Sequence, residues 1–110
     1  MKRYCLTLDL KDDPKIIQQY EEHHKAVWPG VLDSIRDSGI EGMEIYRFGN
    51  RLFMIMEVND AFSFEKKEES DKNNAEVQRW EELMWQFQQP VEGARPGEKW
   101  VLMNKIFELK

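Results

Sequence analysis

Apolar and polar residues alternate at the start of the chain. Over residues 4–10, tyrosine and leucine side chains fall on one face and mostly polar side chains on the other. This two-residue period predicts a half-buried strand. Asp13 and Pro14 then supply an N-cap and a proline at the first helical position, which predict the start of a helix. The apolar spacing changes there to three and four residues, along a stripe of Ile17, Tyr20, His24 and Val27.

Three more helical segments follow from the pattern. Trp28-Pro29 should bend or restart the first helix, because the residue before a proline is pushed out of the α region. The apolar stripe resumes and continues to Gly39, a residue suited to ending a helix. Later, residues 65–74 form a very polar helical stretch, and residues 77–87 have the spacing of a second amphipathic helix.

Three further strands are predicted. Residues 43–48 and 51–58 flank Gly49-Asn50, a two-residue hairpin turn with glycine first. The second arm of this hairpin is apolar on both faces, which is typical of a strand that is central in its sheet or covered by a second subunit. The chain closes with a strand predicted over Trp100–Leu109, again apolar on alternating positions of both faces.

The predicted elements follow the order β-α-β-β-α-β, the split βαβ or ferredoxin-like arrangement. We therefore expect an α+β fold with helices on one face of a sheet, in a single domain spanning residues 1–110. The strands carry more apolar surface than two helices can cover, and its burial is worth about 25 cal/mol per Å². We infer a homodimer joined through the sheet faces.

Composition narrows the classes of function. The 110 residues contain 16 Lys and Arg against 21 Asp and Glu, giving a formal net charge of -5. This balance, with no basic run, argues against a nucleic-acid partner. One cysteine excludes an internal disulfide framework and a cysteine-rich zinc site. Because no apolar run resembles a signal peptide or a membrane span, we expect a soluble, cytoplasmic protein with no membrane partner.

Two adjacent histidines are the first candidates for chemistry. His23 and His24 lie about 100° apart on a helix, so they cannot share one face. His24 falls on the apolar side, four residues after Tyr20 and four before Trp28. It is either a packed core histidine or a general acid/base, since the reference pKa of imidazole is about 6.5. In the second interpretation, Tyr20 places a hydroxyl beside the same small cavity.

Trp80 and Glu81 suggest a site of another kind. Trp80 belongs to the apolar stripe of its helix, so core packing explains it. A flat ring beside a carboxylate is also how proteins often hold sugars, because the ring covers C–H faces and the carboxylate accepts from hydroxyls. Both interpretations stay open from the residues alone.

Other chemistries find little support in the sequence. Adjacent histidines lack the i, i+4 spacing of a zinc-binding helix, and no carboxylate cluster completes three ligands. Cys5 has no histidine placed beside it by the sequence, so a structural thiol is its ordinary role. No glycine-rich phosphate loop exists, and the run Glu65–Asp71 is interpreted as a solvated helix face. We expect no metal and no cofactor.

Several segments match a known family when they are taken together. They are Tyr20-x-x-x-His24-x-x-x-Trp28-Pro29, then Glu44-Ile45-Tyr46, and then Val77-Gln78-Arg79-Trp80. This pattern resembles the rhamnose/fucose mutarotases over essentially the whole chain, with nearly the same spacing. The first segment is the most specific part of the resemblance.

The resemblance implies a dimeric α/β-barrel arrangement of ferredoxin topology, free of metal and cofactor. It also implies an isomerase that interconverts the α and β anomers of a 6-deoxy-L-hexose. His24 matches the catalytic acid/base histidine of the family, and Tyr20 and Trp80 match sugar-contacting positions. Glu81 stands where rhamnose-type members often have a second tryptophan, and Met43 where they often have a tyrosine. Because both departures fall on the sugar-contacting side, the sugar is L-rhamnose or L-fucose.

Mutarotation agrees with the residues found, since ring opening needs one or two proton-transfer groups and no metal, nucleophile or redox centre. We expect His24 to move the ring-oxygen proton, with Tyr20 or a bound water at the anomeric hydroxyl. Two other classes fit the same fold. One is a cofactor-independent monooxygenase or haem-degrading protein of the dimeric barrel type, and the other is a non-catalytic sugar-binding module.

Overall fold

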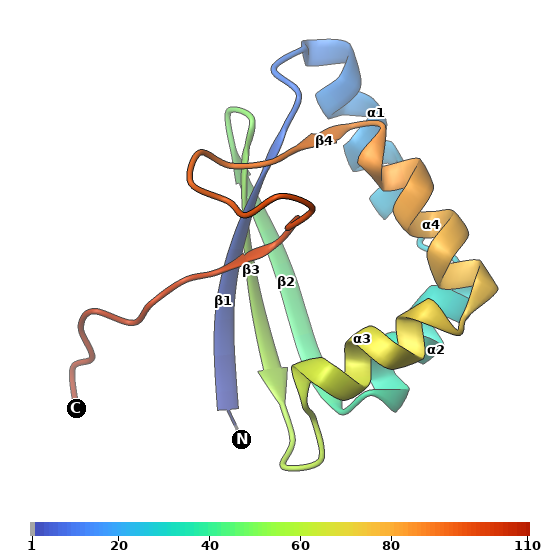
Figure 1. Cartoon of the computed structure of the whole chain (residues 1–110). Helices are drawn as coiled ribbons and strands as arrows, with labels where there is room; N and C mark the ends of the chain where they lie inside the picture. Colours follow the sequence, from blue (N-terminus) through green and yellow to red (C-terminus); the bar gives the residue numbers. More distant parts are fainter. Residues whose placement is uncertain (1) are drawn as a thin grey trace.

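The computed structural model describes residues 2–110 of the chain. Its helices are α1 (Pro14–His24), α2 (Pro29–Asp37), α3 (Phe64–Lys72) and α4 (Ala75–Trp85). Its strands are β1 (Lys2–Leu10), β2 (Ile40–Phe48), β3 (Arg51–Val58), β4 (Gln88–Gln89) and β5 (Val101–Leu102). The helices gather on one side of the sheet, and the chain ends on the other side (Figure 1).

Local sequence signals set the boundaries of the first two helices. The Asp13 side chain accepts a hydrogen bond from the backbone N–H of Lys15 at 2.9 Å, and Pro14 opens α1. Pro29 opens α2, and Trp28 before it has a ψ of 136°, outside the helical range. The predicted restart of the helix at Trp28-Pro29 is therefore confirmed.

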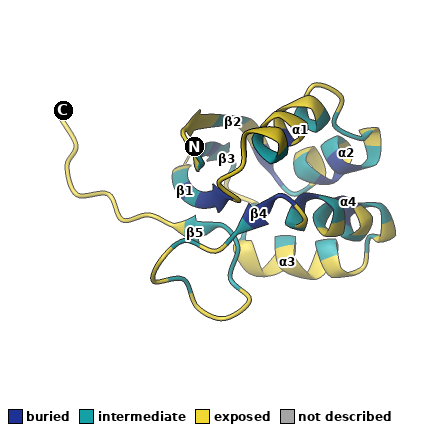
Figure 2. Ribbon diagram, turned by 90° about the horizontal axis from the view of Figure 1, so that it is seen from above, coloured by how far each residue is buried: buried dark blue, intermediate teal, exposed yellow. Residues whose placement is uncertain are grey.

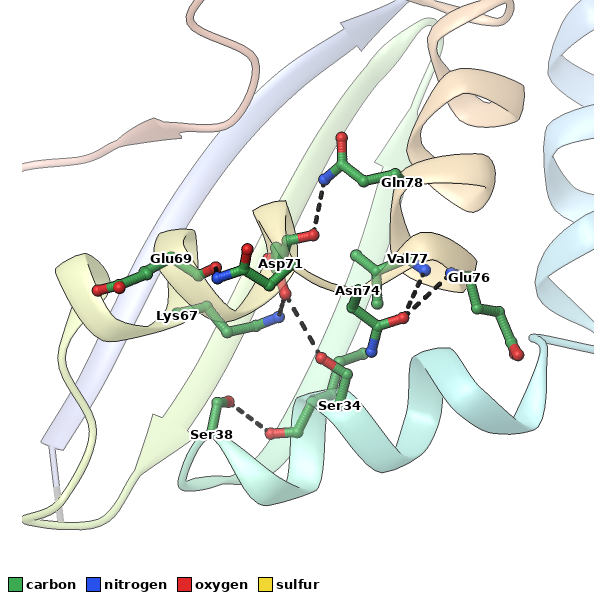
Figure 3. A network of polar contacts seen from close by, with 11 residues as sticks. Ser34, Ser38, Lys67, Glu69, Asp71, Asn74, Glu76, Val77 and Gln78 are labelled. Carbon is green, nitrogen blue, oxygen red and sulfur yellow. Dashed lines mark hydrogen bonds and ion pairs between the residues drawn. The ribbon is translucent and has the colours of Figure 1, made fainter.

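Asn74 separates the last two helices. Its side-chain oxygen accepts hydrogen bonds from the backbone N–H groups of Glu76 and Val77, both at 3.1 Å (Figure 3). α4 then buries Val77, Trp80 and Met84, as its apolar spacing predicts. None of the helices in residues 2–110 is long and apolar enough to cross a membrane.

The sheet has the strand order β2-β3-β1-β4, and β5 also pairs with β1. All of these pairs are antiparallel, and the register places Leu6 opposite Met54 and Leu8 opposite Leu52. This order is the split βαβ topology, so the predicted α+β, ferredoxin-like fold is confirmed. The face with these paired side chains is the buried one, and its fully buried residues include Leu8, Leu10, Leu52 and Val58.

The opposite face of the sheet has no helix over it (Figure 2). Phe53 and Ile55 of β3 alternate with the buried residues of that strand and remain half-buried. On β2, Tyr46 is 52% exposed and Phe48 is 89% exposed. This outer face therefore carries apolar side chains that helices do not cover.

The last predicted strand, Trp100–Leu109, is wrong beyond its first residues. Only Val101–Leu102 pairs with β1, and the Met103 N–H then donates to the Cys5 carbonyl at 2.8 Å. The chain continues without regular structure, and Ile106 is 95% exposed. The sequence does alternate over this segment. Beyond Leu102, however, no strand within residues 2–110 pairs with it.

The short strand β4 was not predicted. Gln88 pairs with Leu10 and Gln89 with Asp9, at the end of β1. Two residues are too few to show a period along the sequence, and β4 is recognised as a strand only because it pairs with β1. Its consequence is that the buried Gln88 side chain reaches the side of α1.

Candidate functional site

A cavity of about 620 Å³ lies between the sheet and the helices. Its wall combines residues of all four helices with residues of β2, β3 and β4 and of the segment before β5, among them Tyr20, His24, Met54, Trp80, Gln88 and Trp100. This volume falls within the range of small-molecule sites, about 300–1,000 Å³. The cavity therefore suits a small organic ligand.

Tyr20 lies on α1 and is 3% exposed. The Gln88 side-chain N–H donates to the Tyr20 hydroxyl oxygen at 3.3 Å. Burial raises the pKa of Tyr20 to about 12, and the bond from Gln88 opposes this only in part. The phenol stays protonated at neutral pH, and its O–H can still donate because Gln88 uses only the oxygen.

His24 is the last residue of α1 and is half-buried. Its Nδ1 lies 3.0 Å from the backbone carbonyl oxygen of Tyr20. Because a carbonyl only accepts, this contact places the proton on Nδ1 and leaves the lone pair on Nε2 of the neutral ring. Burial lowers the pKa of His24, and the bond to the Tyr20 carbonyl opposes this only in part. His24 is therefore uncharged at neutral pH, with Nε2 free to act as a base.

Tyr20, His24 and Trp80 pack against one another, and we call them the aromatic wall of the cavity. The ring centroids of Tyr20 and His24 are 4.4 Å apart, and those of His24 and Trp80 are 5.6 Å apart at an interplanar angle of 69°. Trp28 supports Trp80 from another side, with centroids 5.2 Å apart. The structure thus brings the three predicted residues together, and Trp80 is a core residue and a cavity residue at once.

Glu81 follows Trp80 on α4 and lies on the wall of the same cavity. It is half-buried, and burial raises the pKa of its carboxyl, an effect that Lys99 opposes. The position agrees with the predicted sugar-binding role, which itself stays a prediction.

Lys67 and Asp71 line the cavity, which the sequence interpretation missed. The run Glu65–Asp71 was expected to be a solvated face, but the side chains of Lys67 and Asp71 are only 18% and 17% exposed and line the cavity. Their i, i+4 spacing is a signal of a pair. Glu68 and Lys72 have the same spacing and side-chain exposures of 71% and 70%. Spacing alone therefore does not show which pair turns inward.

Other candidate chemistries have no comparable arrangement. Within residues 2–110, no group of three or more His, Cys, Asp or Glu side chains is placed to hold a metal ion. The His23 ring lies 5.4 Å from the Phe87 ring, and Cys5 is half-buried in β1. What the cavity holds is one neutral base, one protonated phenol and charged groups beside them.

Comparison with known sequences identifies relatives over nearly the full length. The family described as L-rhamnose mutarotase matches residues 3–109. The chain is 43% identical over 111 residues to an L-fucose mutarotase of Xanthomonas campestris pv. campestris, covering 99% of this chain and 89% of that protein. It is 32% identical over 115 residues to a UPF0734 protein of Dictyostelium discoideum, covering 98% and 90%.

Solved structures with the same fold have lower identity. An L-rhamnose mutarotase of Formosa agariphila superposes with a TM-score of 0.71 at 21% identity, covering 100% of both chains. Tetracenomycin F2 cyclase of Streptomyces glaucescens has a TM-score of 0.64 at 15% identity, covering 100% and 98%. A dimeric ferredoxin-like protein from an uncultured marine organism has a TM-score of 0.55 at 12% identity, covering 98% and 91%. At these identities the likeness shows the fold alone.

The fold alone does not identify the protein family, and the sequence matches do. The cyclase and the mutarotase share one architecture, whereas the match over residues 3–109 and the 43% identical relative both point to mutarotases. Mutarotases are isomerases, so the predicted family and enzyme class are confirmed. The chain belongs to the L-rhamnose mutarotase family.

Proposed function

We propose that this protein interconverts the α and β anomers of a 6-deoxy-L-hexose by general acid/base ring opening. One observation carries the proposal: His24 sits in a ligand-sized cavity as a neutral imidazole whose Nδ1 proton is held by the Tyr20 carbonyl. A base in this state is suited to removing a hydroxyl proton near neutral pH. The 43% identical relative is named for the same reaction.

His24 begins the reaction as the base. Its Nε2 takes the proton from the anomeric hydroxyl O1, a C1=O1 double bond forms, and the C1–O5 electron pair moves to O5. The imidazolium then gives its proton to O5, which restores neutral His24 and releases the open-chain aldehyde. Rotation about C1–C2 and the reverse steps close the ring as the other anomer. Protons and electrons balance over the cycle, and O1 and O5 share one carbon, so a single base serves both.

Tyr20 supports the ring oxygen in this proposal. The phenol is protonated, and Gln88 occupies its oxygen and leaves the O–H free to donate. A hydrogen bond to O5 stabilises the negative charge that develops there as the C1–O5 bond breaks. Tyr20 therefore assists at the ring oxygen, whereas the sequence alone suggested a role at the anomeric hydroxyl.

Trp80 and Glu81 hold the sugar in this proposal. The Trp80 ring adjoins His24, so a sugar whose C–H face lies on the indole would lie beside the His24 ring. Glu81 on the same cavity wall accepts hydrogen bonds from hydroxyl groups.

L-Fucose is the first substrate to test and L-rhamnose the second. The relative over 99% of this chain is named an L-fucose mutarotase, and the family is named for L-rhamnose. Saturation-difference NMR at the anomeric protons of L-fucose, L-rhamnose and D-glucose, with and without protein, measures the exchange directly. Faster exchange of one 6-deoxy sugar is the expected result. Saturable binding with unchanged exchange would instead support a binding module, and a haem absorbance band on titration would support the haem-protein alternative.

We also infer that the protein forms a homodimer through the outer face of its sheet. Phe53, Ile55 and Tyr46 lie there without a helix over them, and Ile106 and Phe107 follow β5 at 95% and 77% exposure. A solved protein of the same fold is described as dimeric. Sedimentation of wild type and of a chain ending at Met103 tests this, with a weaker dimer expected after truncation. A wild-type monomer at all concentrations contradicts it, and a cytoplasmic location stays a prediction.

A further inference from the structure

The cavity has a second part, formed by charged side chains. Lys67 and Asp71 come from α3, Glu81 from α4, and Lys99 from the segment before β5, and all four line the same cavity as His24. We call these four residues the charged wall. The mechanism above uses only Glu81 from this set, so the other three are charges in a cavity without an assigned role.

Asp71 is held firmly within the charged wall. Its Oδ1 is 2.5 Å from Lys67 Nζ and accepts from the Ser34 hydroxyl at 3.4 Å, while its backbone carbonyl accepts from the Gln78 side chain at 2.8 Å (Figure 3). Both side-chain contacts use Oδ1. Among residues 2–110, no fully buried side-chain oxygen or nitrogen lacks a hydrogen-bond partner. Asp71 Oδ2 has no hydrogen-bond partner within that range, so it is not fully buried and is left to accept from a ligand.

The stability of α3 as a helix does not require Lys67 and Asp71 to face the cavity. Burying an ion pair costs desolvation that often exceeds its Coulombic gain. The same helix carries a second i, i+4 pair, Glu68 and Lys72, which stays in solvent with 71% and 70% side-chain exposure. α3 therefore needs no inward pair for its own solubility or helicity. A partly buried pair in a cavity is suited to binding a polar ligand, because the carboxylate accepts and the ammonium donates.

The chemistry of the two candidate sugars shows what such a pair can do. L-Fucose has the galacto configuration and L-rhamnose the manno configuration, so they differ at C2 and C4 and agree at C1 and O5. His24 acts at C1 and O5, and it therefore treats the two sugars alike. Discrimination therefore has to come from groups that contact the hydroxyls at C2 or C4.

We propose that Lys67 and Asp71 bind the hydroxyls of the sugar at C2 or C4 and determine which 6-deoxy-L-hexose the enzyme accepts. This inference rests on the proposed function. Glu81 lines the same cavity and can accept from the sugar beside them. The two lysines offset the two carboxylates, so the charged wall suits a neutral polyol better than an anionic sugar.

Asp71→Asn tests the assignment because it keeps the shape and removes the charge. NMR exchange rates are measured over a range of concentrations of L-fucose and of L-rhamnose, and KM and kcat are fitted separately. We expect kcat/KM for the preferred sugar to fall about tenfold, mainly through KM, because the neutral amide accepts more weakly than the carboxylate and no longer pairs with Lys67. The preference between the two sugars should shrink by a similar factor. Glu68→Gln, on the exposed side of the same helix, should leave both sugars unchanged.

The outcomes separate this inference from the function on which it rests. An equal fall for both sugars, or no change, overturns the role in specificity while the mutarotase activity stands. A wild-type protein that exchanges neither sugar overturns both proposals. If Asp71→Asn fails to fold by circular dichroism, Lys67→Gln decides by the same change in preference, since it removes the ammonium and leaves Asp71 with its bond from Ser34.

Discussion

The aromatic wall and the charged wall line one cavity but are assembled in different ways. Tyr20 and His24 belong to one helical turn, and the bond that orients His24 runs to a carbonyl four residues earlier. Lys67 and Asp71, by contrast, meet the cavity only because α3 packs beside α2 and α4. The residues proposed for proton transfer are thus placed by local structure, and those proposed to bind hydroxyls are placed by tertiary packing. Substitutions of Tyr20 or His24 should change the exchange rate of every sugar by the same factor. Substitutions of Lys67 or Asp71 should change the rates of different sugars by different factors.

His24→Ala has the largest expected effect. Removing the only base of the aromatic wall should lower kcat by about a hundredfold to ten-thousandfold, the usual contribution of a positioned acid/base group. NMR exchange should show the same factor for L-fucose and L-rhamnose. His23→Ala is the matched control, since the neighbouring ring lies against Phe87. A folded His24→Ala protein with near-normal exchange would exclude His24 as the base.

The pH profile is the next test of the aromatic wall. Burial lowers the pKa of His24 below its ordinary value of 6.5, and protonation removes the lone pair on Nε2. The exchange rate should therefore reach half of its maximum below pH 6.5, and below the lowered pKa its fall should approach tenfold per pH unit. Asp71→Asn should keep this profile for either sugar. Half-maximal activity at or above pH 6.5 would contradict the neutral, buried imidazole.

Tyr20→Phe should have a smaller effect on the reaction and a distinct one on folding. Loss of the donor to O5 should lower kcat about tenfold for both sugars. Gln88, only 6% exposed, loses the acceptor for its side-chain N–H, so the free energy of unfolding should fall by about 1–3 kcal/mol. Denaturant unfolding measures this second effect. Tyr4→Phe, at a tyrosine packed against Phe62 and Phe64, should leave the exchange rates unchanged.

Glu81→Gln should have the smallest effect, and it should distinguish sugar binding from proton transfer. A neutral amide still accepts from hydroxyls but more weakly than a carboxylate, so KM should rise about threefold with kcat nearly constant. Titration of exchange rates against sugar concentration distinguishes the two constants. The exposed neighbour Glu82 provides the control Glu82→Gln. A fall in kcat as large as that of Tyr20→Phe would instead place Glu81 in proton transfer.

The sequence was informative where structure depends on near neighbours. The apolar stripe of α1, the break at Trp28-Pro29 and the hairpin turn all follow from local rules, and each is present. The order of the elements was enough to predict the ferredoxin-like topology. For the same reason His24 and Tyr20 could be placed together, because residues i and i+4 share a helix face.

The features that were missed depend on distant partners. Gln88 reaches Tyr20 across 68 positions of the chain through the two-residue strand β4. Lys67 and Asp71 turn inward, while an identically spaced pair on the same helix does not. The expected strand over Trp100–Leu109 has the right alternation but lacks a neighbouring strand beyond Leu102. In each case the missing information was the identity of the packing partner.

The acceptor that orients His24 is a main-chain atom, the carbonyl oxygen of Tyr20. No side-chain replacement can delete it while the last turn of α1 persists, so the tautomer of the base is insensitive to mutation elsewhere in the cavity. A library that randomises the charged wall should therefore keep the contact between His24 Nδ1 and the Tyr20 carbonyl in clones that fold. If both proposals hold, sugar preference can change during evolution while the group that opens the ring is retained.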